Sequence, residues 1–94
     1  MNVVHNPENN RFEVFEDDHL ARLEYRLRDG KMYFMHTKVP DALGGRGIAT
    51  ALAKTSLEYA QSEEIKIVVY CPFVKAYMLR HSEYNHLLAK KEKE

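Results

Sequence analysis

The sequence predicts a mixed α/β domain of the α+β type, with three antiparallel strands, a crossover helix, a parallel fourth strand and a C-terminal helix. Its 94 residues suffice for one hydrophobic core but not for two. Residues 19–28 alternate between apolar and charged side chains and end at Asp29-Gly30, a strong hairpin signal. A helical pattern then lies between two hydrophobic runs, residues 31–39 and 65–70. We therefore expect one domain over residues 1–94, with a core of about residues 11–84.

The first two strands are each expected to have an apolar and a polar face. Residues 11–16 place Phe12 and Val14 on one side and Phe15 on the other, before a turn at Asp17 and Asp18. In residues 19–28, one side carries Ala21, Leu23, Tyr25 and Leu27, and the other carries Arg22, Glu24, Arg26 and Arg28. The arginines could attract an acidic partner, but the interruption by Glu24 favours an ordinary solvated strand face.

The second half of the chain indicates a parallel crossover. Residues 31–39 are apolar on both faces, as in a central strand, and Pro40 ends them. From about Gly47 the spacing becomes that of an amphipathic helix, and residues 65–70 form a β-branched run typical of a buried strand. The strand–helix–strand order predicts a right-handed connection. Pro72 suits the start of a second helix reaching about Arg80, and the tail from Leu87 is expected to be a frayed helical end.

The overall charge argues against bulk binding to nucleic acid. The chain is 45% hydrophobic and 30% charged, with 14 basic and 14 acidic residues, so an anion must be recognised by a local site. The single cysteine excludes an intramolecular disulfide. We find no secretory signal and no run of membrane-spanning length, so we expect a cytoplasmic protein that binds neither nucleic acid nor membrane. The five histidines lack zinc-site spacing, so no metal is expected.

A glycine-rich turn, residues 44–49, stands directly before the first predicted helix. Its glycines let the backbone approach a ligand, and the helix start adds unpaired amides and a positive dipole end. The turn therefore either cradles a phosphate or simply caps the helix. It is not a Walker motif, because no Gly-Lys-Ser/Thr follows, and Thr50 stands where a dinucleotide-binding motif needs its last glycine.

The arrangement resembles the small, single-domain branch of the GNAT N-acetyltransferase superfamily. The resemblance runs from roughly Phe12 to Tyr84. The broad motif Gln/Arg-x-x-Gly-x-Gly/Ala falls on residues 44–49 and is moderately specific, whereas the segment Cys-Pro-Phe-Val-x-x-Tyr, from Cys71 to Tyr77, is more diagnostic. The compact branch lacks the long amino-terminal helices of ordinary members, and residues 1–10 supply none here.

The resemblance implies a binding site for acetyl-CoA. The turn and helix start would hold its pyrophosphate, and the pantetheine arm would lie between two splayed strands, residues 32–39 and 65–70. The implied cofactor-binding residues are Val39, Gly44, Gly45, Arg46, Gly47, Ile48, Ala49 and Thr50. The first motif position, usually Gln or Arg, is Gly44 here, so we expect backbone amides to hold the anion and Arg46 to supply charge.

Three side chains are candidates for catalysis. Cys71 ends a strand and opens a helix, where it could carry the acetyl group or protonate the CoA thiolate; it could equally be a small buried residue. His36, near the end of the partner strand, could act as a base facing Cys71 or the incoming amine, or could only fill space. Tyr77 could donate a proton to the thiolate, as in GNAT enzymes, or pack in the core.

Two functions follow from these residues. The first is an acetyl-CoA-dependent N-acetyltransferase acting on an unidentified amine. The second is an acyl-CoA-binding module that acetylates itself on Cys71 or senses the cofactor without turnover. We expect a monomer or a weak dimer in either case.

Overall fold

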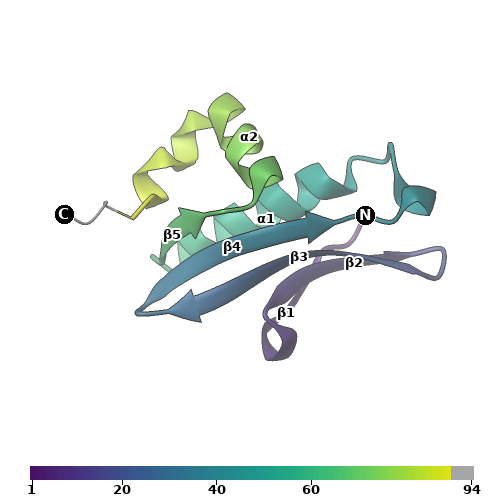
Figure 1. Ribbon diagram of the computed structural model, residues 1–94, viewed down its shortest axis with the longest axis horizontal. Helices are drawn as coiled ribbons and strands as arrows, with labels where there is room; N and C mark the ends of the chain where they lie inside the picture. Colours follow the sequence, from purple (N-terminus) through teal and green to yellow (C-terminus); the bar gives the residue numbers. More distant parts are fainter. Residues whose placement is uncertain (90–94) are drawn as a thin grey trace.

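The computed structural model describes residues 1–89, and these form one five-stranded sheet with two α-helices and three short 3-10 helices (Figure 1). The strands lie in chain order across the sheet, and only the β4–β5 pair is parallel. The elements are β1 (Val4–Asn6), η1 (Pro7–Asn9), β2 (Arg11–Glu16), β3 (His19–Arg28), β4 (Lys31–Lys38), η2 (Asp41–Leu43), α1 (Ile48–Ser62), β5 (Lys66–Val69), α2 (Pro72–Arg80) and η3 (Ser82–Leu87).

The predicted fold class and element order are confirmed, with one strand more than expected. β1 pairs antiparallel with β2, so four antiparallel strands precede the crossover rather than three. His5 anchors this strand: its ring stacks on Phe12 with centroids 4.2 Å apart, and its Nε2 lies 2.6 Å from the Tyr25 hydroxyl. The lead-in before residue 11 is therefore part of the sheet, held by side-chain contacts that its short polar sequence does not reveal.

The β3–β4 hairpin turns as the sequence predicts. Asp29 and Gly30 have φ angles of 53° and 74°, the two positive values that a type I′ turn requires. Leu27 was expected to share the apolar face of Ala21 and Leu23, but it is 58% exposed.

The sheet has two different faces. α1 lies behind the sheet in Figure 1, and we call the side that it covers the inner face. Apolar side chains of β2–β5 pack there against α1 and α2, and the largest fully buried ones include Phe12, Leu23, Phe34, Leu52 and Ile67. The opposite side, the outer face, is covered by no helix among residues 1–89.

A bulge in β4 changes which residues reach each face. Glu24 pairs with His36, but the next residue, Tyr25, pairs with Phe34, so Met35 has no partner on β3. One extra residue reverses the alternation of the strand. Thr37, opposite buried Leu23, therefore belongs to the inner face, and His36 belongs to the outer face.

β4 and β5 separate before β4 ends. Their register runs from Lys31–Lys66 to Phe34–Val69, and the amides of Tyr70 and Cys71 then both donate to the Phe34 carbonyl, at 2.9 and 3.0 Å. The remaining residues of β4, 35–38, have no partner in β5. We call this place the branch point.

The C-terminal part differs from the frayed helix that the sequence predicts. After α2, residues Ser82–Leu87 form the 3-10 helix η3, and Leu88 bridges to Ile67, while the Ala89 amide donates to the Ile67 carbonyl at 2.9 Å. The last five residues of the expected tail lie outside the described part of the chain. No helix within residues 1–89 combines the length and apolar character needed to cross a membrane.

Candidate functional site

The glycine-rich turn leaves the start of α1 without a side-chain cap. Gly45 and Gly47 both have φ of 78°, and Gly47 is the N-cap residue of α1. The Gly47 carbonyl accepts a hydrogen bond from the Ala51 amide. The amides of the first helical turn have no helical carbonyl four residues before them, so they form no hydrogen bond within the helix. A Cβ atom at Gly45 or Gly47 would meet nothing within 4 Å. The turn therefore presents unpaired amides to open space.

These amides border a cavity of about 300 Å³, which we call the glycine-turn cavity. Every predicted cofactor-binding residue except Arg46 lines it. The full lining is Val39, Pro40, Asp41, Leu43, Gly44, Gly45, Gly47, Ile48, Ala49, Thr50 and Phe73. The three glycines, Ala49 and Thr50 leave the part of the cavity beside the start of α1 open, which suits a ligand that approaches the amides closely.

Arg46 does not line this cavity, and its expected role as the source of charge stays a prediction. Its guanidinium lies 3.1 Å from a carboxylate oxygen of Glu16 and 2.9 Å from one of Asp17, and it also donates to the Ala42 carbonyl at 3.4 Å. The hydrogen bonds to Asp17 and Glu16 raise the pKa of Arg46. The side chain therefore ties the glycine-rich turn to the β2–β3 turn.

A second cavity, of about 360 Å³, adjoins the first between α1 and α2. It is lined by Thr50, Phe73, Ala76, Tyr77, Arg80 and His81, and it shares Thr50 and Phe73 with the glycine-turn cavity. The ring of Tyr77, only 9% exposed, stacks on His81 with centroids 4.1 Å apart. Burial, assisted by Glu83 and Glu58, raises the pKa of the Tyr77 phenol, so it stays protonated near neutral pH.

Cys71 lies at the branch point and is buried, with 1% of its surface exposed. Its Sγ is 3.2 Å from Oγ1 of Thr37, a distance at which either group can donate a hydrogen bond. Thr37 is a site residue that the sequence did not indicate, because the bulge at Met35 brings it to the inner face. The thiol and hydroxyl together form a pair of proton donors beside the end of β5.

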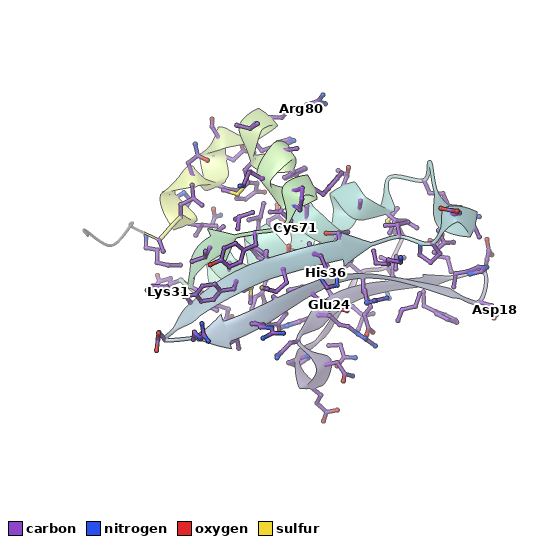
Figure 2. The ribbon with its side chains drawn as sticks, viewed as in Figure 1. Asp18, Glu24, Lys31, His36, Cys71 and Arg80 are labelled. Atoms are coloured by element: carbon purple, nitrogen blue, oxygen red, sulfur yellow. The ribbon has the colours of Figure 1, made fainter. Side chains whose placement is uncertain are left out.

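His36 lies on the other side of the sheet from Cys71, so the expectation that it might face the thiol is wrong. Its Nε2 is 3.1 Å from Oε1 of Glu24, and its side chain is 56% exposed. Figure 2 shows His36 and Glu24 together on the uncovered side of the sheet, with Cys71 across β4 toward α2. Glu24 also accepts a hydrogen bond from Arg22, which is the main reason that the pKa of its carboxyl is lowered. The Glu24 carboxylate thus holds the exposed imidazole on the outer face.

The structure therefore divides the predicted residues into separate groups. The turn residues meet in one cavity, Cys71 lies at the branch point, and His36 opens to the outer face. No hydrogen bond joins Tyr77 to Cys71 within residues 1–89. Within the same residues, no group of three or more His, Cys, Asp or Glu side chains is arranged to hold a metal ion.

The comparisons with known proteins agree with this geometry. A family model described as GCN5-related N-acetyl-transferase matches residues 11–87. Protein NATD1 from Gallus gallus and from Mus musculus is 44% identical over 43 residues, which is 46% of this chain but only 39% of each relative. The matched segment of these relatives is thus less than half their length.

A solved structure extends the likeness to nearly the whole fold. A GCN5-like protein from Staphylococcus aureus, determined by NMR, superposes with a TM-score of 0.72 and 29% sequence identity. The match covers 97% of this chain and 90% of that one. Family model and fold together support an N-acetyltransferase. Because the family model spans most of the sequence, from β2 to the end of η3, the chain belongs to the GCN5-related N-acetyltransferase family.

Proposed function

We propose that the protein transfers an acetyl group from acetyl-CoA to an amine. The observation that carries this proposal is the glycine-turn cavity, where positive-φ glycines and the uncapped start of α1 lie close to the end of β4. Helix amides without partners attract phosphate oxygens through hydrogen bonds and the helix dipole. The chain as a whole has no net charge, so this local site is what favours an anionic ligand.

The residues of the turn fit the diphosphate of acetyl-CoA. The amides of residues 45–50 would hold the diphosphate. Val39 and Phe73 would border the pantetheine arm that is joined to it. No side chain at Gly45 or Gly47 blocks the approach. When bound, acetyl-CoA supplies an acetyl group activated as a thioester.

On the outer face, we propose His36 as the general base. With Nε2 donating to the Glu24 carboxylate, Nδ1 is left with the lone pair that accepts a proton. The lowered pKa of Glu24 keeps its carboxylate ionised near neutral pH, which favours the imidazolium that forms. His36 would thus take a proton from the amine nitrogen as the new C–N bond forms.

At the branch point, we propose Cys71 as a proton donor. Its thiol, paired with the Thr37 hydroxyl, would protonate the sulfur that is released as the thioester C–S bond breaks. Cys71 would then recover a proton from solvent by way of Thr37. Tyr77, kept protonated by burial, is the second candidate for this donor, from the adjoining cavity.

The alternative, a module that acetylates itself on Cys71, is less consistent with the thiol's surroundings. Sγ is buried and already hydrogen-bonded to Thr37, so an acetyl group there would have to displace packed neighbours. The exposed imidazole of His36 instead offers a base to a ligand arriving from outside.

The two functions are separated by incubating the protein with acetyl-CoA, measuring its intact mass, and following release of free CoA while small amines are screened. We expect CoA release that depends on an amine, and no stable mass increase. A stable adduct on Cys71, with no amine accelerating CoA release, would support the self-acetylating module instead. A cytoplasmic location and a monomeric or weakly dimeric state remain predictions from the sequence.

A further inference from the structure

We propose that the acceptor is an amine joined through an apolar or aromatic spacer to an anionic group, bound in a cavity on the outer face. This inference rests on the proposed function and names its substrate class. The cavity, of about 300 Å³, is lined by Arg26, Leu27, Arg28, Tyr33, Met35 and Tyr70. We call it the outer cavity.

Its two arginines make the outer cavity positive. Other arginines of the outer face are neutralised by neighbours, because Arg11 pairs with Glu13 and Arg22 pairs with Glu24. Arg26 and Arg28, in contrast, make no ion pair with any acidic group among residues 1–89. Register places one lysine beside them, since Arg28 pairs with Lys31, whereas the ammonium of Lys66 donates to the His86 carbonyl at 2.9 Å. A carboxylate or similar anion is the ligand group that such a site prefers.

An aromatic wall adjoins these charges. The rings of Tyr33 and Tyr70 are stacked, with centroids 6.1 Å apart and planes 25° apart, and Tyr70 is 60% exposed. Met35, the bulged residue of β4, completes the apolar part. Flat rings and a thioether favour an aromatic or apolar group, so the anion and a hydrophobic spacer can be held side by side.

The outer cavity lies close to the residues that we propose for acetyl transfer. Met35 and Tyr70 directly follow the last β4–β5 pair, and Arg26 lies opposite Tyr33, two residues before Met35. At the usual rise along a strand, an anion at Arg26 lies about 7–10 Å from the branch point. His36 follows Met35 on the same face. An acceptor bound by its anion at Arg26 would therefore extend its amine toward His36 and the branch point.

The experiment compares two amines that differ only in charge at the far end. 4-(Aminomethyl)benzoate carries the anion, and 4-(aminomethyl)benzamide replaces it with a neutral amide. Acetyl transfer from acetyl-CoA is followed for both by CoA release. We expect the benzoate to be preferred by about tenfold in kcat/KM at low salt, with the preference falling as ionic strength rises, since the arginines are exposed.

Variants then test which residues give the preference. Arg26→Gln and Arg28→Gln should each reduce the preference about threefold, because each removes one partner of the carboxylate. Lys54→Gln, which removes an exposed positive charge on α1, should leave it unchanged. Equal rates for the two amines in the unmodified protein, or a preference that survives Arg26→Gln combined with Arg28→Gln, would overturn the proposal.

Binding without the cofactor separates this inference from the proposed function. Amide NMR of the full chain with 4-(aminomethyl)benzoate should show shifts at Tyr33, Met35 and Tyr70 that weaken in the Arg26→Gln variant. Such binding without acetyl transfer to any amine would contradict the proposed function and leave the outer cavity as a binding site. Transfer to amines without these shifts would overturn the outer cavity and leave the proposed function intact.

Discussion

The two faces of the sheet present different kinds of surface to a ligand. On the inner side, beside α1, the glycine-turn cavity is lined by three glycines, the uncapped start of α1 and several apolar side chains, and the nearby Arg46 is engaged with Glu16 and Asp17 instead of lining it. On the outer face, side chains dominate: the Glu24–His36 pair and the residues of the outer cavity. Backbone geometry is thus expected to determine binding of acetyl-CoA, and side-chain chemistry to determine the acceptor.

The largest effect is expected from Gly47→Val. A β-branched residue at φ of 78° is strongly disfavoured, so the turn must change shape or its amides must move. We expect CoA affinity to fall at least about a hundredfold, as measured by isothermal titration calorimetry. Since a Cβ at Gly47 meets no protein atom within 4 Å, the loss reflects the turn and its ligand rather than a clash in the core.

Gly30→Val is the matched control for this change. Gly30 has φ of 74° and equally open surroundings, but it lies in the β3–β4 hairpin, away from the glycine-turn cavity. Both variants should lose similar stability, about 1–2 kcal/mol each. Only Gly47→Val should lose CoA binding. A folded Gly47→Val protein with normal CoA affinity would refute the proposal that the glycine-rich turn binds CoA.

Replacing the base should lower turnover next most strongly. His36→Gln removes the proton acceptor of the outer face, and we expect kcat to fall about a hundredfold with little change in CoA affinity. Glu24→Gln, which keeps the shape of the side chain but not its charge, should have a smaller effect in the same direction. Steady-state CoA release measures both, and unchanged kcat in His36→Gln would exclude this histidine as the base.

Cys71 should contribute less, because Thr37 and solvent can also supply protons. We expect Cys71→Ala to reduce kcat about tenfold and Cys71→Ser to restore part of the loss. Complete loss of turnover in Cys71→Ala, together with an acetyl adduct on the unmodified protein, would show instead that the thiol carries the acetyl group.

Acid should weaken the attachment of β1. Burial lowers the pKa of His5 below its ordinary value of 6.5, so below pH 6.5 the unfolded chain binds more protons than the folded one. Stability is therefore retained above pH 6.5 and decreases as the pH falls below it. Urea unfolding at several pH values should show this decrease, and His5→Leu should reduce it; an identical pH dependence in the variant would exclude His5 as its source.

The smallest effect is expected at Arg46. Its guanidinium is exposed and already paired with Glu16 and Asp17, so Arg46→Gln should change CoA affinity by less than about threefold. Calorimetry under the conditions used for Gly47→Val provides the comparison. A loss similar to that of Gly47→Val would mean that this side chain leaves its carboxylates to bind the ligand.

The parts of the fold that follow from local patterns were predictable from the sequence. Alternation defined β2 and β3, the Asp29-Gly30 pair defined the hairpin, and Pro72 marked the start of α2. β1 was missed because three residues of mixed polarity carry no periodic signal, and their attachment depends on contacts between His5 and distant rings.

The site was predictable where it depends on backbone motifs and less so where it depends on long-range register. The glycine-rich turn was identified from its own residues. The bulge at Met35 was not, and it exchanges the faces of His36 and Thr37, so Thr37 rather than His36 lies against Cys71. The pairing of Arg46 with the β2–β3 turn likewise joins residues 30 positions apart, beyond the reach of local patterns.

CoA and the acceptor are expected to bind on opposite sides of the sheet. The most direct test is a two-step amide NMR titration of the full chain, first with CoA and then with 4-(aminomethyl)benzoate. We predict that CoA shifts the amides of residues 44–51, and that the amine afterwards shifts those of Arg26, Tyr33 and Tyr70 without reversing the first set. An absence of shifts between residues 44 and 51 on adding CoA would contradict the proposal that CoA binds at the glycine-rich turn.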